Sequence, residues 1–324
     1  MKVLVTGGAG YIGSHTCKAL KEAGHQPIVV DNLVYGHEWA VKWGPFHKLD
    51  IRETEELTAL LEKEKPDAVI HFAAFAYVGE SVKEPEKYYD NNVRGTESLL
   101  KAMTNTGITK IVFSSTCATY GIPETLPITE ATPQNPINPY GDTKLKVEEK
   151  LRKLGSTGIF SATALRYFNA AGADPEGEVG EHHEPETHLI PLAIEAALTN
   201  KFSLTIFGTD YETEDGTCVR DYIHVSDLAD AHVLALEKLT PGFRAFNLGT
   251  GNGVSVKQVL DSVGSACGED VPFLIGDRRE GDPPELVADV SLAEKELGWK
   301  AKHDLNSIAK TASNWFKKHH MEIS

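Results

Sequence analysis

Cysteines are few in this sequence, long apolar runs are missing, and negative charge outweighs positive charge. The 324 residues include four scattered cysteines and no CxxC pair. Such usage argues against a disulfide framework or a cysteine metal site, and it is typical of buried thiols in a reducing compartment. No stretch approaches the ~18 consecutive apolar residues that a membrane-spanning helix needs.

The N-terminal segment MKVLVTGGAGYIGSH superficially resembles a secretory signal, because a basic residue precedes a short apolar run. Glycines interrupt that run too early for the hydrophobic core of a signal peptide. We therefore expect a cytoplasmic protein.

The formal net charge of −15 argues against a broad surface for nucleic acid or anionic membranes. A local group of arginines is still compatible with binding a small anion. Apolar residues make up 41% of the chain and charged residues 24%, as in an ordinary globular protein. The length is sufficient for two domains.

Short β-rich runs alternate with helical patterns through the first half of the chain. The runs are almost continuously apolar, which is typical of parallel strands buried on both faces. This alternation predicts an α/β fold with a doubly wound parallel Rossmann sheet. The expected strands cover residues 2–7, 27–31, 67–74, 110–115 and 161–169, and the expected helices cover 12–24, 54–65, 93–107 and a segment from Pro139.

The alternation of strands and helices stops after residue 170, where AGADPEGEVGEHHEPETH (171–188) is rich in Gly, Pro and Glu. Loops of this length in compact domains are usually functional or disordered. We place a boundary here, between a first domain at 1–170 and a smaller C-terminal α/β substrate domain at 171–324. Some later segments are expected to pack back on the first domain.

A glycine-rich turn follows the first strand and opens the first helix. Gly7, Gly10 and Gly13 fit GxxGxxG, and glycine allows the backbone to approach a pyrophosphate at a helix N-terminus. The second strand ends in Asp31, whose carboxylate suits an adenosine ribose and repels a 2′-phosphate. The pattern therefore predicts NAD rather than NADP.

The segment NPINPYGDTKLKVEEK places Tyr140 and Lys144 four residues apart. Asn138 and Pro139 are typical of a helix start, and residues i and i+4 share a helix face. Lys⁺ and a cationic nicotinamide both favour a phenolate, which is a good general base for an alcohol proton. Thr116, at the end of the preceding strand, is the expected hydroxyl partner, and Ser115 is the next candidate.

Several segments together resemble the extended short-chain dehydrogenase/reductase family. They are TGGAGYIG, VIHFAA, DNNVRGT, SSTCATYG, NPYGDTK, LRYFNAAGA and CVRDYIHVSDLADAHVLAL. DYETEDGTCVRDYIHV and RREGDPPELVAD are most similar to the UDP-glucose 4-epimerases within that family. The resemblance runs from residue 2 to nearly the end of the chain. It implies a tightly held NAD, a UDP-sugar substrate and a homodimer.

The resemblance also implies a mechanism. Tyr140 takes the proton of the sugar 4-hydroxyl while hydride passes from C4 to the nicotinamide. The keto sugar then turns its other face to the cofactor, and the returning hydride inverts the centre.

The resemblance repeats the roles given above to the motif residues and implies the others, residue by residue. The cofactor-binding positions are Gly7, Gly10, Tyr11, Ile12, Gly13, Asp31, Asn32, Asp50, Ile51, Phe72, Ala73, Asn91, Ser114, Tyr140, Lys144 and Tyr167. The substrate-binding positions are Thr116, Tyr140, Asn169, Leu189, Arg220, Arg279, Asp282 and Leu286.

Three positions depart from the pattern. Ala76 stands where a lysine is often found, His188 replaces a common asparagine, and Thr116 replaces a serine. His182 and His183 are adjacent in a Glu-rich loop, and we interpret them as solvated side chains. No metal site is expected.

Alternatives remain open for the function. A UDP-N-acetylhexosamine, UDP-pentose or UDP-uronate 4-epimerase shares nearly every motif, and Leu286 predicts slower turnover of N-acetylated sugars. A 4,6-dehydratase needs an acidic pair after the threonine, where this chain has Cys117 and Ala118. A non-catalytic NAD-sensing regulator would not need Tyr140.

Overall fold

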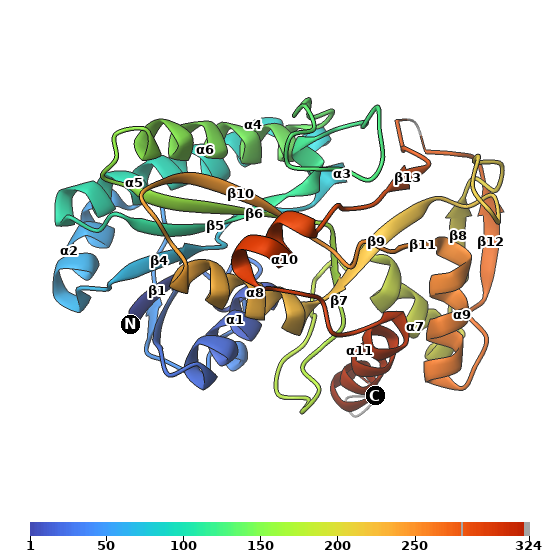
Figure 1. The fold of residues 1–324 in the computed structure, drawn as a ribbon. Helices are drawn as coiled ribbons and strands as arrows, with labels where there is room; N and C mark the ends of the chain where they lie inside the picture. The colour runs from blue at the N-terminus through green and yellow to red at the C-terminus, as the bar shows by residue number, and fades with distance from the viewer. Residues whose placement is uncertain (280, 321–324) are drawn as a thin grey trace.

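The computed structural model describes residues 1–279 and 281–320. Its centre is a seven-stranded parallel sheet in the order β10-β6-β5-β4-β1-β2-β3 (Figure 1). The strands are β1 (Lys2–Thr6), β2 (Gln26–Asp31), β3 (Phe46–Lys48), β4 (Ala68–His71), β5 (Lys110–Thr116), β6 (Ser161–Tyr167) and β10 (Gly242–Leu248).

Helices cover both faces of this sheet (Figure 1). Val3 and Val5 of β1 are buried in the same apolar cluster as α1 and α8, whereas Leu4 joins α2, α5 and α6 on the other face. This burial on both faces explains the continuous apolar runs, and the expected doubly wound fold is confirmed. The helices are α1 (Tyr11–Glu22), α2 (Thr54–Glu64), α5 (Gly95–Thr106), α6 (Pro139–Gly155) and α8 (Val225–Glu237).

A smaller group of elements lies beside the sheet and is formed mainly by the later part of the chain (Figure 1). Strand β9 pairs in parallel with β7 and β13 and antiparallel with β11, and β8 pairs with β12. Helices α7, α9 and α11 share an apolar cluster. The bounds are β7 (Asn169–Ala171), β8 (Leu204–Phe207), β9 (Val219–His224), β11 (Gly253–Ser255), β12 (Phe273–Gly276), β13 (Glu285–Leu286), α7 (Leu189–Thr199), α9 (Val256–Cys267) and α11 (Leu305–His320).

Later segments also return to the large sheet. Strand β10 pairs with β6, and Leu297 of α10 is buried in the cluster that contains α1 and α8. Residues 172–188 form neither helix nor strand, as expected for the Gly- and Pro-rich segment. The bounds of α10 are Ser291–Leu297.

Several short elements differ from the sequence prediction. The expected strand at 161–169 is two strands, because the bond from the Phe168 N–H to the Leu248 carbonyl is the last of the β6–β10 pairing and Asn169 then pairs with Tyr222 of β9. In the first 120 residues, six short elements lack a long apolar period and were not expected. They are β3, η1 (Glu38–Ala40), α3 (Val78–Lys83), α4 (Pro85–Tyr88), η2 (Tyr89–Arg94) and η3 (Cys117–Thr119).

Among the described residues, no helix combines the length and apolar character needed to cross a bilayer.

Candidate active site

A cavity of about 700 Å³ lies at the carboxyl ends of the central strands. Gly7 follows β1, Phe72 follows β4, Thr116 ends β5 and Tyr167 ends β6, and all four line the cavity. Strand order reverses between β1 and β4, and open α/β sheets bind ligands at such a switch point. The fold therefore brings these strand ends to one site.

The cavity gathers all the predicted site residues except Asp50 and Leu189. Asp50 adjoins it by accepting a hydrogen bond from Asn32 Nδ2 at 2.9 Å. Leu189 begins α7 and packs against the apolar cluster of α7, α9 and α11. The predicted residues that line the cavity are Gly7, Gly10, Tyr11, Ile12, Gly13, Asp31, Asn32, Ile51, Phe72, Ala73, Asn91, Ser114, Thr116, Tyr140, Lys144, Tyr167, Asn169, Arg220, Arg279, Asp282 and Leu286.

The glycine-rich turn is held where side chains do not fit. Gly7 has a φ of +72°, and a Cβ there would lie 2.6 Å from the Ala73 nitrogen. A Cβ at Gly13 would lie 2.1 Å from the Gly7 carbonyl oxygen, so glycine is needed for α1 to start against the turn. This leaves the helix N-terminus open toward an anion.

Asp31 lies beside this turn at the end of β2. Its carboxylate accepts hydrogen bonds from the backbone N–H of Ala9 at 3.1 Å and of Leu33 at 2.8 Å. Burial raises the pKa of this carboxyl, and the two backbone donors act in the opposite direction. The side chain is thereby fixed at the cavity wall with acceptor capacity left for a ribose hydroxyl.

Helix α6 starts as the sequence predicts. The Asn138 side chain accepts a hydrogen bond from Gly141 N at 2.8 Å, and Pro139 is the first helical residue. This start directs Tyr140 and Lys144 from the first two turns into the cavity, where both are buried.

Lys144 is held by the strand beneath it. Its Nζ donates to the Ser114 carbonyl at 2.7 Å and lies 4.9 Å from the centre of the Phe113 ring. Burial lowers the pKa of Lys144 to about 7, and the nearby carboxylate of Glu148 acts in the opposite direction. Lys144 is thus a buried amine close to its titration point at neutral pH.

The pKa of Tyr140 differs from the sequence expectation. Burial raises it above the ordinary value of 10.0, and the neighbouring Tyr167 adds to the rise. A hydrogen bond with Thr116 lowers it in part. The protein's own groups therefore keep the phenol protonated, because desolvation of the phenolate outweighs the nearby donors.

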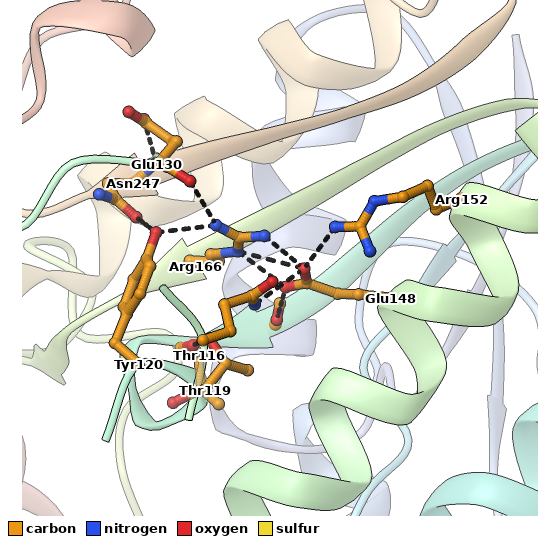
Figure 2. A network of polar contacts seen from close by, with 10 residues as sticks. Thr116, Thr119, Tyr120, Glu130, Glu148, Arg152, Arg166 and Asn247 are labelled. Atoms are coloured by element: carbon orange, nitrogen blue, oxygen red, sulfur yellow. Dashed lines mark hydrogen bonds and ion pairs between the residues drawn. The ribbon is translucent and has the colours of Figure 1, made fainter. Parts of the chain in front are cut away.

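A buried ion pair anchors α6 to the sheet behind the site. Figure 2 shows Glu148 facing Arg166 of β6, whose Nη2 lies 2.6 Å from Glu148 Oε2. Both side chains are almost completely buried. Arg166 also donates to Tyr120 Oη at 2.9 Å, and Tyr120 donates to Asn247 Oδ1 at 2.6 Å (Figure 2). The network links α6, β6 and β10 one helical turn from Lys144.

The opposite end of the cavity carries two arginines. Arg220 on β9 is paired with Asp282, and its backbone lies opposite Leu286 in the β9–β13 pairing. Arg279 lies over the Phe207 ring, with its guanidinium carbon 4.1 Å from the ring centre. This end can hold an anion against charge-assisted donors.

The histidine loop was interpreted wrongly from the sequence. His183 is only 17% exposed and forms ion pairs with Glu181 and Glu186. Burial lowers the pKa of His183, but the two carboxylates outweigh it and raise the pKa to about 9. The spacing E-x-H-x-x-E-x-H could have indicated that these side chains lie close together, because residues two or three apart in a loop can point to one side.

With this geometry described, the chain can be compared with known proteins. The sequence pattern of the NAD dependent epimerase/dehydratase family matches residues 3–249. The chain belongs to this family. A UDP-glucose 4-epimerase from Rhizobium meliloti is 55% identical over 317 residues, which cover 97% of this chain and 96% of that protein.

Solved structures of family members have the same fold. A UDP-glucose 4-epimerase from Brucella ovis in complex with NAD is 53% identical, covering 97% of this chain and 98% of that one, with a TM-score of 0.94. One from Stenotrophomonas maltophila with bound NAD and formylated UDP-arabinopyranose is 41% identical over 100% of both chains, with a TM-score of 0.97.

The residues present fit the cofactor of the epimerase/dehydratase family, NAD. The turn at Gly7 and Gly13 leaves backbone N–H groups for a pyrophosphate, and Asp31 is fixed where an adenosine ribose would lie. Both features lie in the first part of the chain, whereas the two arginines that line the cavity lie in the later part.

Proposed function

We propose that the protein is a UDP-glucose 4-epimerase that interconverts UDP-galactose and UDP-glucose with bound NAD. One observation carries the proposal: Tyr140, Lys144 and Thr116 converge in the same cavity as the dinucleotide turn and Arg220. Alcohol oxidation needs a base, a bound hydride acceptor and a bound substrate. This cavity has residues that can act as the base, bind the cofactor and bind the substrate.

Tyr140 acts as the general base toward the sugar 4-hydroxyl, and Thr116 donates a hydrogen bond to the oxygen of that hydroxyl. When bound, NAD would supply the hydride acceptor for C4 and a positive charge that favours the phenolate. Lys144, which donates a hydrogen bond to the Ser114 carbonyl, lies near the same site, and positive charge there would disfavour its protonated form. Because burial raises the pKa of Tyr140, positive charge from the cofactor would favour formation of the base.

Arg220 and Arg279 bind the diphosphate end of the substrate, and Asn169 contributes a polar contact beside it. Holding the nucleotide while the sugar is free to turn presents either face of C4 to the cofactor. Leu286 faces the sugar and leaves more room than an aromatic residue would, which favours some turnover of N-acetylated UDP-sugars.

We further propose that the protein is cytoplasmic and forms a homodimer through helices of its first domain. The first domain covers residues 1–170, and residues 171–324 mainly bind the substrate. Light scattering on the purified protein tests the dimer.

The activity is tested by adding UDP-galactose to purified protein without added NAD and following UDP-glucose. Conversion is expected, and denatured protein should release close to one NAD(H) per chain. Absence of conversion in protein that carries NAD would reject the proposed reaction, and release of NADP would reject the role of Asp31.

A further inference from the structure

Two glutamates and two histidines converge in the loop between β7 and α7. We call them the His–Glu cluster: Glu181, His183, Glu186 and His188. One ligand atom from each residue lies within 4.8 Å of the ligand atoms of the other three. The cluster is thus compact enough to surround one small ion.

The four histidine–glutamate separations in the cluster are close enough for these side chains to share one small ion, for which tetrahedral ligand atoms lie roughly 3.3–3.6 Å apart. His183 Nδ1 lies 3.2 Å from a Glu181 oxygen and 3.6 Å from a Glu186 oxygen. His188 Nδ1 lies 3.0 Å and 2.8 Å from oxygens of the same two residues. Metal–ligand bonds of ~2.0–2.2 Å in a tetrahedron give this spacing of roughly 3.3–3.6 Å between neighbouring ligand atoms.

The ion pairs of His183 leave its Nδ1 atom without a well-aligned hydrogen bond. Its Nδ1 is buried, and no partner within the described residues meets hydrogen-bond geometry with it. A buried nitrogen without an aligned acceptor is costly, whereas its lone pair could bind a cation at the cluster centre.

Charge leads to the same conclusion. The Glu181 side chain is only 7% exposed, and the ion pairs that Glu181 and Glu186 form in the described part of the chain are with the cluster histidines. A divalent ion bound by two carboxylates and two neutral imidazoles also gives a neutral site, so the ion would replace the two histidine protons without leaving the buried carboxylates uncompensated.

A second acidic group shows the contrast. Asp174, Glu176 and Glu178 also converge, but Lys18 Nζ lies among them at 2.9, 2.6 and 2.9 Å. There a side-chain ammonium already occupies the cation position.

We propose that the His–Glu cluster binds one divalent transition-metal ion, with zinc the best fit. Two imidazoles and two carboxylates suit zinc better than Mg²⁺ or Ca²⁺, which prefer oxygen ligands only. Four protein ligands leave no open position, so the ion is structural and does not take part in the reaction.

The site would fix one wall of the cavity. Glu181, His183 and His188 line the cavity, and the His183 ring packs edge-on against Tyr11 at 6.2 Å and Tyr77 at 6.0 Å. Tyr11 belongs to the dinucleotide turn. The bound ion therefore holds the loop against the cofactor end of the cavity.

The test uses the untagged full chain, treated with a chelator, dialysed and titrated with ZnSO₄ by calorimetry. Metal content after gel filtration should approach one zinc per chain. His183→Ala and Glu186→Gln should bind zinc more than ~100-fold more weakly, since loss of even an outer partner costs ~10–100-fold. His182→Ala is the matched control, because His182 is adjacent in sequence but outside the cluster, and it should bind as the wild type does.

Thermal unfolding gives a second readout that does not depend on activity. Zinc should raise the unfolding temperature of the wild type and of His182→Ala but not of Glu186→Gln, a nearly isosteric change chosen to preserve the fold. Stoichiometry far below one, or equal binding by His183→Ala and Glu186→Gln, would overturn the proposal and leave the cluster as an ion-pair network.

Discussion

The Lys144 ammonium lies 5.9 Å from the centre of the Tyr140 ring, and both side chains project from the first two turns of α6 into the cavity. Burial acts on the pair in opposite senses, because it raises the pKa of Tyr140 and lowers that of Lys144. The protein therefore keeps the Tyr140 phenol protonated and leaves Lys144 only partly protonated near neutral pH. Positive charge brought by the cofactor favours the phenolate, which couples base formation to cofactor binding.

Replacing the base tests its role directly. Tyr140→Phe should keep the fold and bound NAD but lower kcat by ~10²–10⁴-fold, the usual contribution of a general base. Initial rates with UDP-galactose measure the loss. Tyr89→Phe removes a phenol outside the cavity and serves as the control, with a rate close to the wild type. A similar rate for Tyr140→Phe would show that another group takes the proton.

Lys144 predicts a specific dependence of stability on pH. Its pKa is about 7 in the folded protein against 10.5 for a free lysine, so unfolding takes up a proton between these values. The free energy of unfolding should therefore rise with pH from 7 to 10.5 more steeply in the wild type than in Lys144→Met. Denaturant unfolding at several pH values measures the difference, and identical slopes would contradict the buried-amine assignment.

The ion pair behind the site should matter more for stability than for chemistry. Glu148→Gln leaves the Arg166 guanidinium buried without its counter-charge, and this should reduce the free energy of unfolding by about 3–5 kcal/mol. Glu149→Gln is the matched control, because Glu149 is adjacent and exposed, and it should change stability by no more than ~0.5 kcal/mol. Equal effects in urea melts would show that the pair is not the anchor of α6.

Leu286 should influence which sugars are accepted. UDP-galactose is expected to be preferred, with slower but measurable turnover of UDP-N-acetylgalactosamine, because a misfit of one or two methylenes costs only ~1–3 kcal/mol. Leu286→Tyr should reduce the second activity more than the first, while Leu286→Met, which keeps the volume, should preserve the ratio. The ratio of kcat/KM values decides, and equal loss of both activities would remove Leu286 from the choice.

Local sequence signals predicted much of the fold and the site's framework. The glycine turn, Asp31 and the Asn138–Pro139 helix start are short motifs whose geometry follows from backbone rules, and each lies at a strand end or helix start. Continuous apolar strands indicated a sheet buried on both faces. These signals need no knowledge of distant contacts.

Other features depend on residues far apart in the chain. Strand β10 lies beside β6 although more than seventy residues separate them, and no local pattern states that pairing. Glu148 has the sequence appearance of a surface charge on an amphipathic helix, yet it is buried because Arg166 lies opposite it. His183 was likewise assigned to solvent, since its burial arises from the way the loop folds back on Tyr11.

The central claim is that C4 is inverted by a reversible oxidation in which its hydrogen is removed as hydride and returned to the same carbon. UDP-galactose carrying deuterium at C4 should be converted, in ordinary water without added NAD, to UDP-glucose that keeps the deuterium at C4. Mass spectrometry of the product gives the answer. Loss of the label to solvent during conversion would contradict the account, because it would mean that C4 is inverted by proton exchange and not by a reversible oxidation.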